Sequence, residues 1–150
     1  MGQAIERLAL EAGHQVVLTV QNTPSVSDLR GADVAVEFTR PEAAVSNLKT
    51  CFEAGVPVVS GTTGWLDAWD DVEAARTAQN GGFFYASNFA LGVNIFFGLS
   101  KHLTQSLDSH ADYTSRIEEV HHVHKLDAPS GTAITLAEAY AVFGFLLLLQ

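Results

Sequence analysis

The sequence predicts an α/β fold with a parallel sheet, followed by a shorter α+β portion. Through residue Asn88, short apolar runs typical of buried strands alternate with helical segments, two of which end at a glycine. Strands separated by helices run parallel, because the connection must cross the sheet. After Asn88 this alternation ends, so we expect a domain boundary between Asn88 and Asn94, which divides the chain into residues 1–90 and 91–150.

The elements of the first part follow from spacing and from helix stop signals. Ile5, Leu8 and Ala9 repeat at helical spacing, and Gly13 supplies a C-terminal stop. Pro41 begins a second helix, which Gly55 ends. Helices are therefore expected at 2–12, 41–55 and 66–80, and strands at 15–20, 32–39, 56–60 and 81–88.

The second part is expected to hold fewer elements. A mostly apolar helix is predicted over 89–107, a strand over 113–124 and a helix over 132–141. The chain has 150 residues, 47% of them hydrophobic, which suffices for one globular domain and a fraction of another.

Composition and charge narrow the class of partner. Lys and Arg number 8 against 17 Asp and Glu, which gives a formal net charge of −9 and disfavours nucleic acid and anionic membranes. The terminal run AVFGFLLLLQ is shorter than the ~20 residues of a membrane-spanning helix. Small molecules or copies of the chain itself are the expected partners. The single cysteine, Cys51, is interpreted as a packing residue, and a reduced, cytoplasmic setting is expected.

Three loops follow successive predicted strands. They are FTRPE at 38–42, SGTTGW at 60–65 and ASNF at 86–89. Ligands of a parallel sheet gather at the carboxyl ends of its strands, where loop amides and helix N-termini converge. Each loop alone is also explained by ordinary turn chemistry, but their shared location favours a binding site.

The densest polar stretch is EEVHHVHKLDAPSGTA at 118–133. In a strand, His122 and His124 point to one face and His121 to the other, so the three would not chelate one metal ion, and no metal site is expected. Histidines that line a polar turn are one alternative. Proton chemistry fits better, because imidazole titrates near neutrality and the SGT turn offers backbone N–H groups to an anion.

The same stretch resembles the active-site signature of the 4-hydroxy-tetrahydrodipicolinate reductase (dihydrodipicolinate reductase) family. That signature is Glu-x-His-His-x-x-Lys-x-Asp-Ala-Pro-Ser-Gly-Thr-Ala, and residues 119–133 match it without a gap. EFTRPE, GTTG at 61–64 and SNFALGVN at 87–94 are similar to further family motifs. The resemblance runs from about residue 1 to residue 139 in the family order.

The resemblance implies hydride transfer from NADPH or NADH to a small dicarboxylate, 4-hydroxy-tetrahydrodipicolinate, in lysine biosynthesis through diaminopimelate. Residues 1–90 would form a Rossmann-like nucleotide-binding domain and 91–150 part of a substrate-binding domain, in a family whose members are commonly homotetramers. His121 matches the histidine proposed as general acid, and Lys125 matches the lysine that binds substrate and assists protonation, so the resemblance implies that these two residues are catalytic. Further substrate contacts match His122, Ser130, Gly131 and Thr132. The implied coenzyme contacts are Gly2, Thr39, Arg40, Gly61, Thr62, Thr63, Ala86, Asn88 and Phe89.

Three departures from the family pattern are visible. The chain begins at Met1-Gly2, where the family has a first strand and a glycine-rich turn, so the sheet is expected to lack its first strand. QNTPS at 21–25 has neither an acid for a ribose nor a basic cluster for a 2′-phosphate, which leaves NADH and NADPH both open. The apolar tail differs from the family continuation, so the second domain is expected to be incomplete. A non-catalytic truncated remnant, with weak or no nucleotide binding, is therefore the alternative to an active reductase.

Overall fold

The computed structural model describes residues 1–110, 112–114, 116–121, 123 and 129–141. The chain forms two compact units, Met1–Ala86 and Ser87–Gln150.

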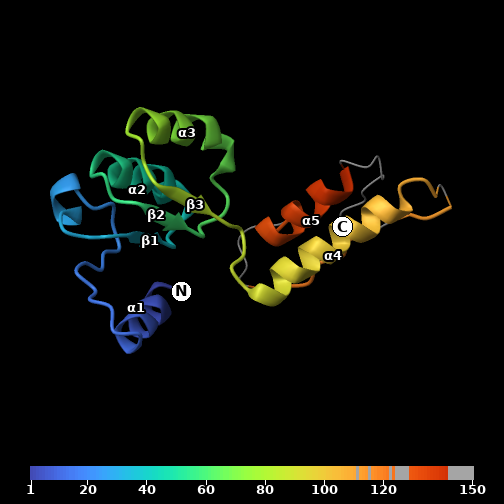
Figure 1. Ribbon diagram of the computed structural model, residues 1–150, viewed down its shortest axis with the longest axis horizontal. Helices are drawn as coiled ribbons and strands as arrows, with labels where there is room; N and C mark the ends of the chain where they lie inside the picture. Colours follow the sequence, from blue (N-terminus) through green and yellow to red (C-terminus); the bar gives the residue numbers. More distant parts are fainter. Residues whose placement is uncertain (111, 115, 122, 124–128, 142–150) are drawn as a thin grey trace. The chain divides into compact units, whose positions relative to one another are not determined.

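A parallel sheet forms the centre of the first unit (Figure 1). Its strands are β1 (Ala35–Glu37), β2 (Val58–Ser60) and β3 (Phe83–Tyr85), in the order β1-β2-β3. Both neighbouring pairs are parallel, and the register aligns Glu37 with Ser60 and Ser60 with Tyr85. The three strands therefore end level with one another, which brings the loops that follow them to one edge of the sheet.

Helices connect these strands, as the predicted α/β class requires. Helix α2 (Pro41–Glu53) lies between β1 and β2, with Pro41 in its first turn. The short 3-10 helix η2 (Leu66–Ala68) and helix α3 (Trp69–Ala78) lie between β2 and β3. The predicted α/β parallel sheet is thus confirmed. A 3-10 turn, η1 (Val26–Leu29), precedes β1.

The core lies between one face of the sheet and helices α2 and α3. Its centre is formed by side chains with almost no exposed area, namely Ala44, Leu48, Phe52, Val58 and Val72. Successive strand residues point to opposite faces, so Val58 and Ser60 are buried whereas Val36 and Phe84 are about half exposed on the other face. Trp65 stacks on Trp69 with ring centroids 5.9 Å apart, and both rings contact Phe83.

The predicted strand at 15–20 is wrong. Helix α1 (Gly2–Glu11) forms as expected and Gly13 follows it with a φ of +85°, but residues 15–20 adopt no strand. A strand needs a neighbour to bond its backbone N–H and C=O groups, and the described sheet ends at β1. Apolar residues in this segment, such as Val17, remain exposed.

Two helices dominate the second unit. Helices α4 (Leu91–Leu107) and α5 (Gly131–Ala141) pack side by side (Figure 1). The predicted strand at 113–124 is wrong for the residues described there, namely 113, 114, 116–121 and 123, which form no strand. The described part of this unit offers no second strand with which they could pair. Among all residues that the structure describes, no helix is both long and apolar enough to cross a membrane.

Cys51 provides a direct test of the core. Its side chain is buried in α2, and burial, with a smaller contribution from the charge of Glu37, raises the pKa of the thiol to about 11. Since the thiolate is the reactive form, we expect Cys51 to resist a thiol reagent in the native chain at neutral pH and to react once the chain is unfolded. Absorbance of the released chromophore measures this. A Ser106→Cys control, on an exposed position of α4, should expose one fast-reacting thiol; fast labelling of the unmodified native chain would contradict the packing.

Candidate functional site

The loops that follow β1 and β2 lie against each other. Thr39, two residues beyond β1, donates its backbone N–H to the hydroxyl oxygen of Thr62 in the next loop at 2.8 Å. This contact is possible because β1 and β2 are neighbouring parallel strands that end at the same edge of the sheet. The structure thus brings together Thr39 and Thr62, two of the coenzyme contacts that the sequence predicts.

Glu37 joins the two loops, and it is absent from the predicted site residues. Its carboxylate is 5% exposed and accepts hydrogen bonds from the hydroxyls of Thr39, Ser60 and Thr62, the last two at 2.6 and 2.9 Å. The Thr39 N–H adds a bond at 3.0 Å. An acidic residue amid a strand's apolar residues was the sequence signal that could have revealed it, since buried carboxylates need several donors.

The loop after β2 depends on Gly61. A Cβ atom at this position would overlap Cε1 of Phe38, and the Gly61 N–H donates to the carbonyl oxygen of Glu37 at 3.0 Å. The indole N–H of Trp65 closes the loop by donating to the Thr62 carbonyl at 2.7 Å. The absence of a side chain at Gly61 therefore lets the backbone pass close to an aromatic ring.

The remaining predicted coenzyme residues are divided between the two units of the chain. Thr63 and Arg40 flank the joined loops, and Ala86 follows β3 and donates its N–H to the Ser60 carbonyl at 3.3 Å. Gly2 is exposed at the start of α1, in the same unit. Two more belong to the second unit, Asn88 and Phe89, and the amide oxygen of Asn88 accepts the Ala90 N–H at 2.8 Å.

The second unit contains a polar cluster at the start of α5. The carboxylate of Glu119 accepts a hydrogen bond from the backbone N–H of Ser130 at 2.9 Å and another from the Ser130 hydroxyl at 2.6 Å. The Ser130 hydroxyl oxygen in turn accepts the Ala133 N–H at 3.1 Å, which is the geometry of a helix N-cap. Glu119 therefore holds the SGT turn through its first residue.

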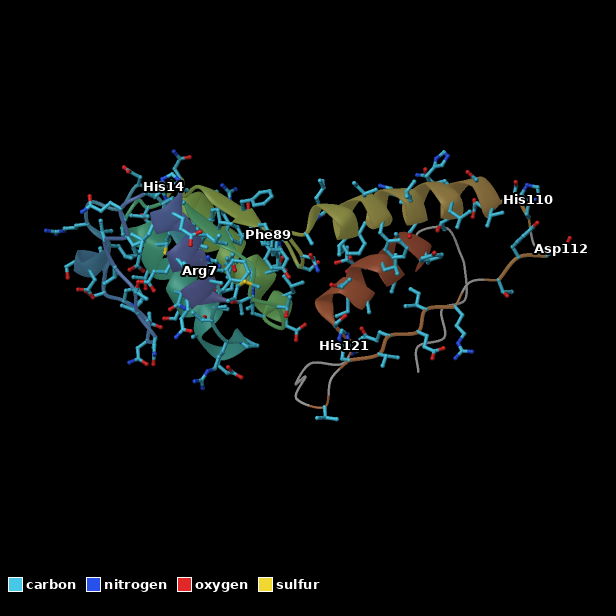
Figure 2. The ribbon with its side chains drawn as sticks, turned by 90° about the horizontal axis from the view of Figure 1, so that it is seen from below. Arg7, His14, Phe89, His110, Asp112 and His121 are labelled. Atoms are coloured by element: carbon cyan, nitrogen blue, oxygen red, sulfur yellow. The ribbon has the colours of Figure 1, made fainter. Side chains whose placement is uncertain are left out.

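His121 lies beside this cluster (Figure 2). Its Nε2 atom is 3.1 Å from Oε2 of Glu119, and the imidazole is 40% exposed. The hydroxyl of Thr132 accepts the Asn88 side-chain amide at 3.4 Å, and Gly131 begins α5. The predicted residues His121, Ser130, Gly131 and Thr132 are therefore near one helix start. His122 and Lys125 lie outside the described residues.

Hydrogen bonding sets the protonation of Glu119. Bonds from the Ser130 hydroxyl and backbone N–H, with a smaller contribution from His121, hold the pKa of the Glu119 carboxyl below its ordinary value of 4.5. At neutral pH the Glu119 carboxyl is ionised and lies within hydrogen-bond distance of Nε2 of His121. The cluster thus combines a titratable imidazole with a helix start that can bind an anion.

Metal ligation finds no support in the part of the chain that the structure describes. There, no group of three or more His, Cys, Asp or Glu side chains is arranged to hold a metal ion. His122 and His124 lie outside that part.

A parallel sheet with crossover helices, and with its loops gathered at the strand ends, defines a Rossmann-type α/β protein. Two family models match this chain, the N-terminus of dihydrodipicolinate reductase over residues 1–89 and its C-terminus over residues 92–143. The chain belongs to the dihydrodipicolinate reductase family, as its signature stretch predicts.

Curated relatives named 4-hydroxy-tetrahydrodipicolinate reductase are similar over most of this chain. The protein of Christiangramia forsetii is 46% identical over 140 residues, which cover 92% of this chain and 59% of the relative. That of Neisseria gonorrhoeae is 38% identical and is matched over 91% of this chain and 51% of its own length. That of Chromobacterium violaceum is 42% identical over 118 residues, which cover 77% of this chain and 42% of the relative. The chain thus spans about half the length of the curated relatives it matches.

Substitution of Gly61 tests the close approach of the loop to Phe38. Because a Cβ atom would overlap the ring, we expect Gly61→Ala to lower the free energy of unfolding by about 1–3 kcal/mol. Urea unfolding followed by tryptophan fluorescence reports on this unit through Trp65 and Trp69. The matched control is Gly2→Ala, whose Cβ would meet no atom within 4 Å and which should leave stability unchanged or slightly raised. Equal stability of the two variants would refute the close approach.

The Glu119 contacts predict a dependence of stability on pH. The pKa is lowered in the folded chain, so the stabilisation is complete above the unfolded value of about 4.5 and is lost as the pH falls through the lower folded-state pKa. We expect Glu119→Gln to lose less stability than the native chain on acidification from about pH 7 to pH 3. Chemical unfolding at several pH values measures this. Glu118→Gln, at the exposed neighbouring position, is the control and should retain the native pH dependence.

Proposed function

We propose that this chain carries the coenzyme site and the proton donor of a reductase that converts 4-hydroxy-tetrahydrodipicolinate to tetrahydrodipicolinate with NADPH or NADH. The names of the relatives support this activity, which belongs to lysine biosynthesis through diaminopimelate. The observation that carries the proposal is the contact of Glu119 with both His121 and Ser130. It joins a candidate proton donor to a helix start suited to a carboxylate. Residues 1–90 would bind the coenzyme, and residues 91–150 the substrate.

The strand-end loops are suited to a dinucleotide. Thr39 and Thr62 join the loops after β1 and β2 at one edge of the sheet, and Gly61, which has no side chain, lets its loop pass close to the Phe38 ring. When bound, NADPH or NADH supplies the hydride, while the chain supplies orientation and exclusion of water. The proposed contacts are Gly2, Thr39, Arg40, Gly61, Thr62, Thr63, Ala86, Asn88 and Phe89.

The substrate is a dicarboxylate, and the start of α5 is proposed to bind one of its carboxylates. Backbone N–H groups at a helix N-terminus and the partial positive charge of the helix both favour an anion. Ser130, Gly131 and Thr132 stand at this position, and because Ser130 donates its N–H and hydroxyl to Glu119, the substrate carboxylate is proposed to bind the Gly131 and Thr132 N–H groups. His122 is proposed to contribute a further contact. Lys125 is proposed as a catalytic residue that binds the substrate through its positive charge and assists protonation.

His121 is proposed to protonate the substrate as it receives the hydride; loss of the 4-hydroxyl group as water completes the conversion to tetrahydrodipicolinate. Its Nε2 atom faces the Glu119 carboxylate, so Nδ1 is proposed as the nitrogen that delivers the proton. The contact with the carboxylate keeps the imidazole ring oriented. Glu119 therefore acts through His121 and is a positioning residue.

A cytoplasmic homotetramer is part of the same proposal. The single, buried Cys51 suits a reducing compartment, and the resemblance to the reductase family implies a tetramer.

Substitution of His121 tests the proposed acid. With freshly generated substrate, we expect His121→Gln to lower turnover by about 10²–10⁴-fold while the affinity for NADH changes little. The loss of reduced-nicotinamide absorbance measures turnover, and quenching of tryptophan fluorescence measures binding. His102→Gln, at an exposed position of α4, is the matched control and should retain native turnover.

Two outcomes would count against the proposal. Native turnover by His121→Gln would remove the acid role of His121. No turnover by the native chain with either coenzyme, at high protein concentration, would favour the non-catalytic remnant instead.

A further inference from the structure

Two polar side chains fasten the connector between β3 and α4 to the start of α5. Ser87 and Asn88 lie in this connector, and both are partly buried. The Ser87 hydroxyl contacts the Thr135 hydroxyl at 2.9 Å, and the Asn88 side-chain amide donates to the Thr132 hydroxyl at 3.4 Å. The bonds span 48 and 44 positions of the chain, and both partners belong to the first two turns of α5.

The Asn88 amide has a fixed orientation. Its Oδ1 atom accepts the Ala90 N–H at 2.8 Å, which leaves Nδ2 as the end that faces Thr132. The side-chain amide of Asn94, in the first turn of α4, donates to the backbone carbonyls of Asn88 and Ala90 at 3.1 and 3.0 Å. The connector is therefore held by α4 as well, and a reversed Asn88 amide would lose its bond from Ala90.

The proton of each hydroxyl on α5 has a defined direction. Thr135 donates to the carbonyl oxygen of Gly131 at 2.9 Å, so the proton in the contact with Ser87 comes from Ser87. Thr132 accepts from Asn88 and donates to none of the residues that the structure describes. Its single proton therefore points away from Asn88. The backbone N–H groups of Gly131 and Thr132 lie in the first turn, where a helix provides no acceptor for them.

We infer that Ser87 and Asn88 are positioning residues for the substrate: they hold the start of α5 and present the Thr132 hydroxyl as a donor to a substrate carboxylate. This inference rests on the proposed function. A donor that is already oriented loses less conformational freedom when its ligand binds. The side chain of Asn88 is thereby assigned to the substrate side, and the coenzyme contact proposed at this residue falls to its backbone.

Asn88→Asp tests this role, because it keeps the acceptor for the Ala90 N–H but replaces the donor to Thr132 by an acceptor that takes the Thr132 proton. We expect pyridine-2,6-dicarboxylate, an aromatic analogue of the substrate, to bind about tenfold more weakly by calorimetry. The affinity for NADH should change by less than about twofold. Gln105→Glu adds the same charge at an exposed position of α4, and this control should bind both ligands as the native chain does.

A double-mutant cycle separates positioning from simple repulsion by the new carboxylate. In a Thr132→Val chain, which lacks the hydroxyl, Asn88→Asp should weaken the dicarboxylate by no more than about twofold further. A tenfold loss that persists without the hydroxyl would mean that Asn88 does not act through Thr132, and it overturns the inference. Unchanged dicarboxylate affinity in Asn88→Asp, or equal weakening of dicarboxylate and NADH, also overturns it.

Hydrogen–deuterium exchange provides a readout that needs no ligand. In Asn88→Asp and in Ser87→Ala, we expect the backbone amides of 131–135 to exchange at least about threefold faster, with α3 unchanged. If the native chain binds no dicarboxylate, the substrate site of the proposed function fails. Exchange then decides whether the connector holds α5: faster exchange supports this part of the inference, and unchanged exchange overturns it.

Ser87→Ala replaces Asn88→Asp if the latter does not fold, because it removes one donor and leaves the bond from Thr135 to Gly131 in place. A loss of dicarboxylate affinity of about two- to fivefold, with native NADH affinity and faster exchange of 131–135, supports the inference. Native values of dicarboxylate affinity and exchange overturn it.

Discussion

The first unit depends on one buried charge that has to be satisfied. Desolvation of the Glu37 carboxylate is costly unless donors surround it, and the parallel register supplies them by aligning Ser60 with Glu37 on the neighbouring strand. The loops follow from this requirement. Thr39 folds back over its own strand end and Thr62 reaches across from the next, so both loops take the conformation in which their hydroxyls meet the carboxylate. Gly61 then passes the ring of Phe38 because no side chain is present to prevent it.

A second carboxylate has a comparable part in the other unit, in a more exposed setting. Glu119 bonds to Ser130, which caps helix α5, and to His121. The same oxygens thus orient a helix start and an imidazole. Both carboxylates act through neighbouring residues. The hydrogen bonds to Glu37 are obligatory because its carboxylate is buried. The hydrogen bonds to the partly exposed Glu119 stabilise the chain only while its carboxyl group is ionised.

Local signals were sufficient for the helices and insufficient for two of the strands. Pro41 and the glycines at 13 and 55 mark helix ends because backbone conformation is decided within a few residues of each position. The apolar run at 15–20 and the alternating segment at 113–124 have strand composition, yet neither forms a strand in its described residues. A strand forms only when its backbone N–H and C=O groups can bond to a neighbouring strand. The residues of the segment alone do not tell whether such a neighbour is present.

The sequence by itself determined the fold class, the family and the residue types at the site, because these depend on periodicity and on a long contiguous motif such as residues 119–133. Tertiary structure alone decided which of those residues cooperate. The pairing of Thr39 with Thr62 spans 23 positions of the chain, and the bond from Ser130 to Glu119 spans 11. The role of Glu37 was missed for the same reason: an acid within an apolar strand signals a need for donors, but only the folded sheet register shows that Ser60 and the neighbouring threonines supply them.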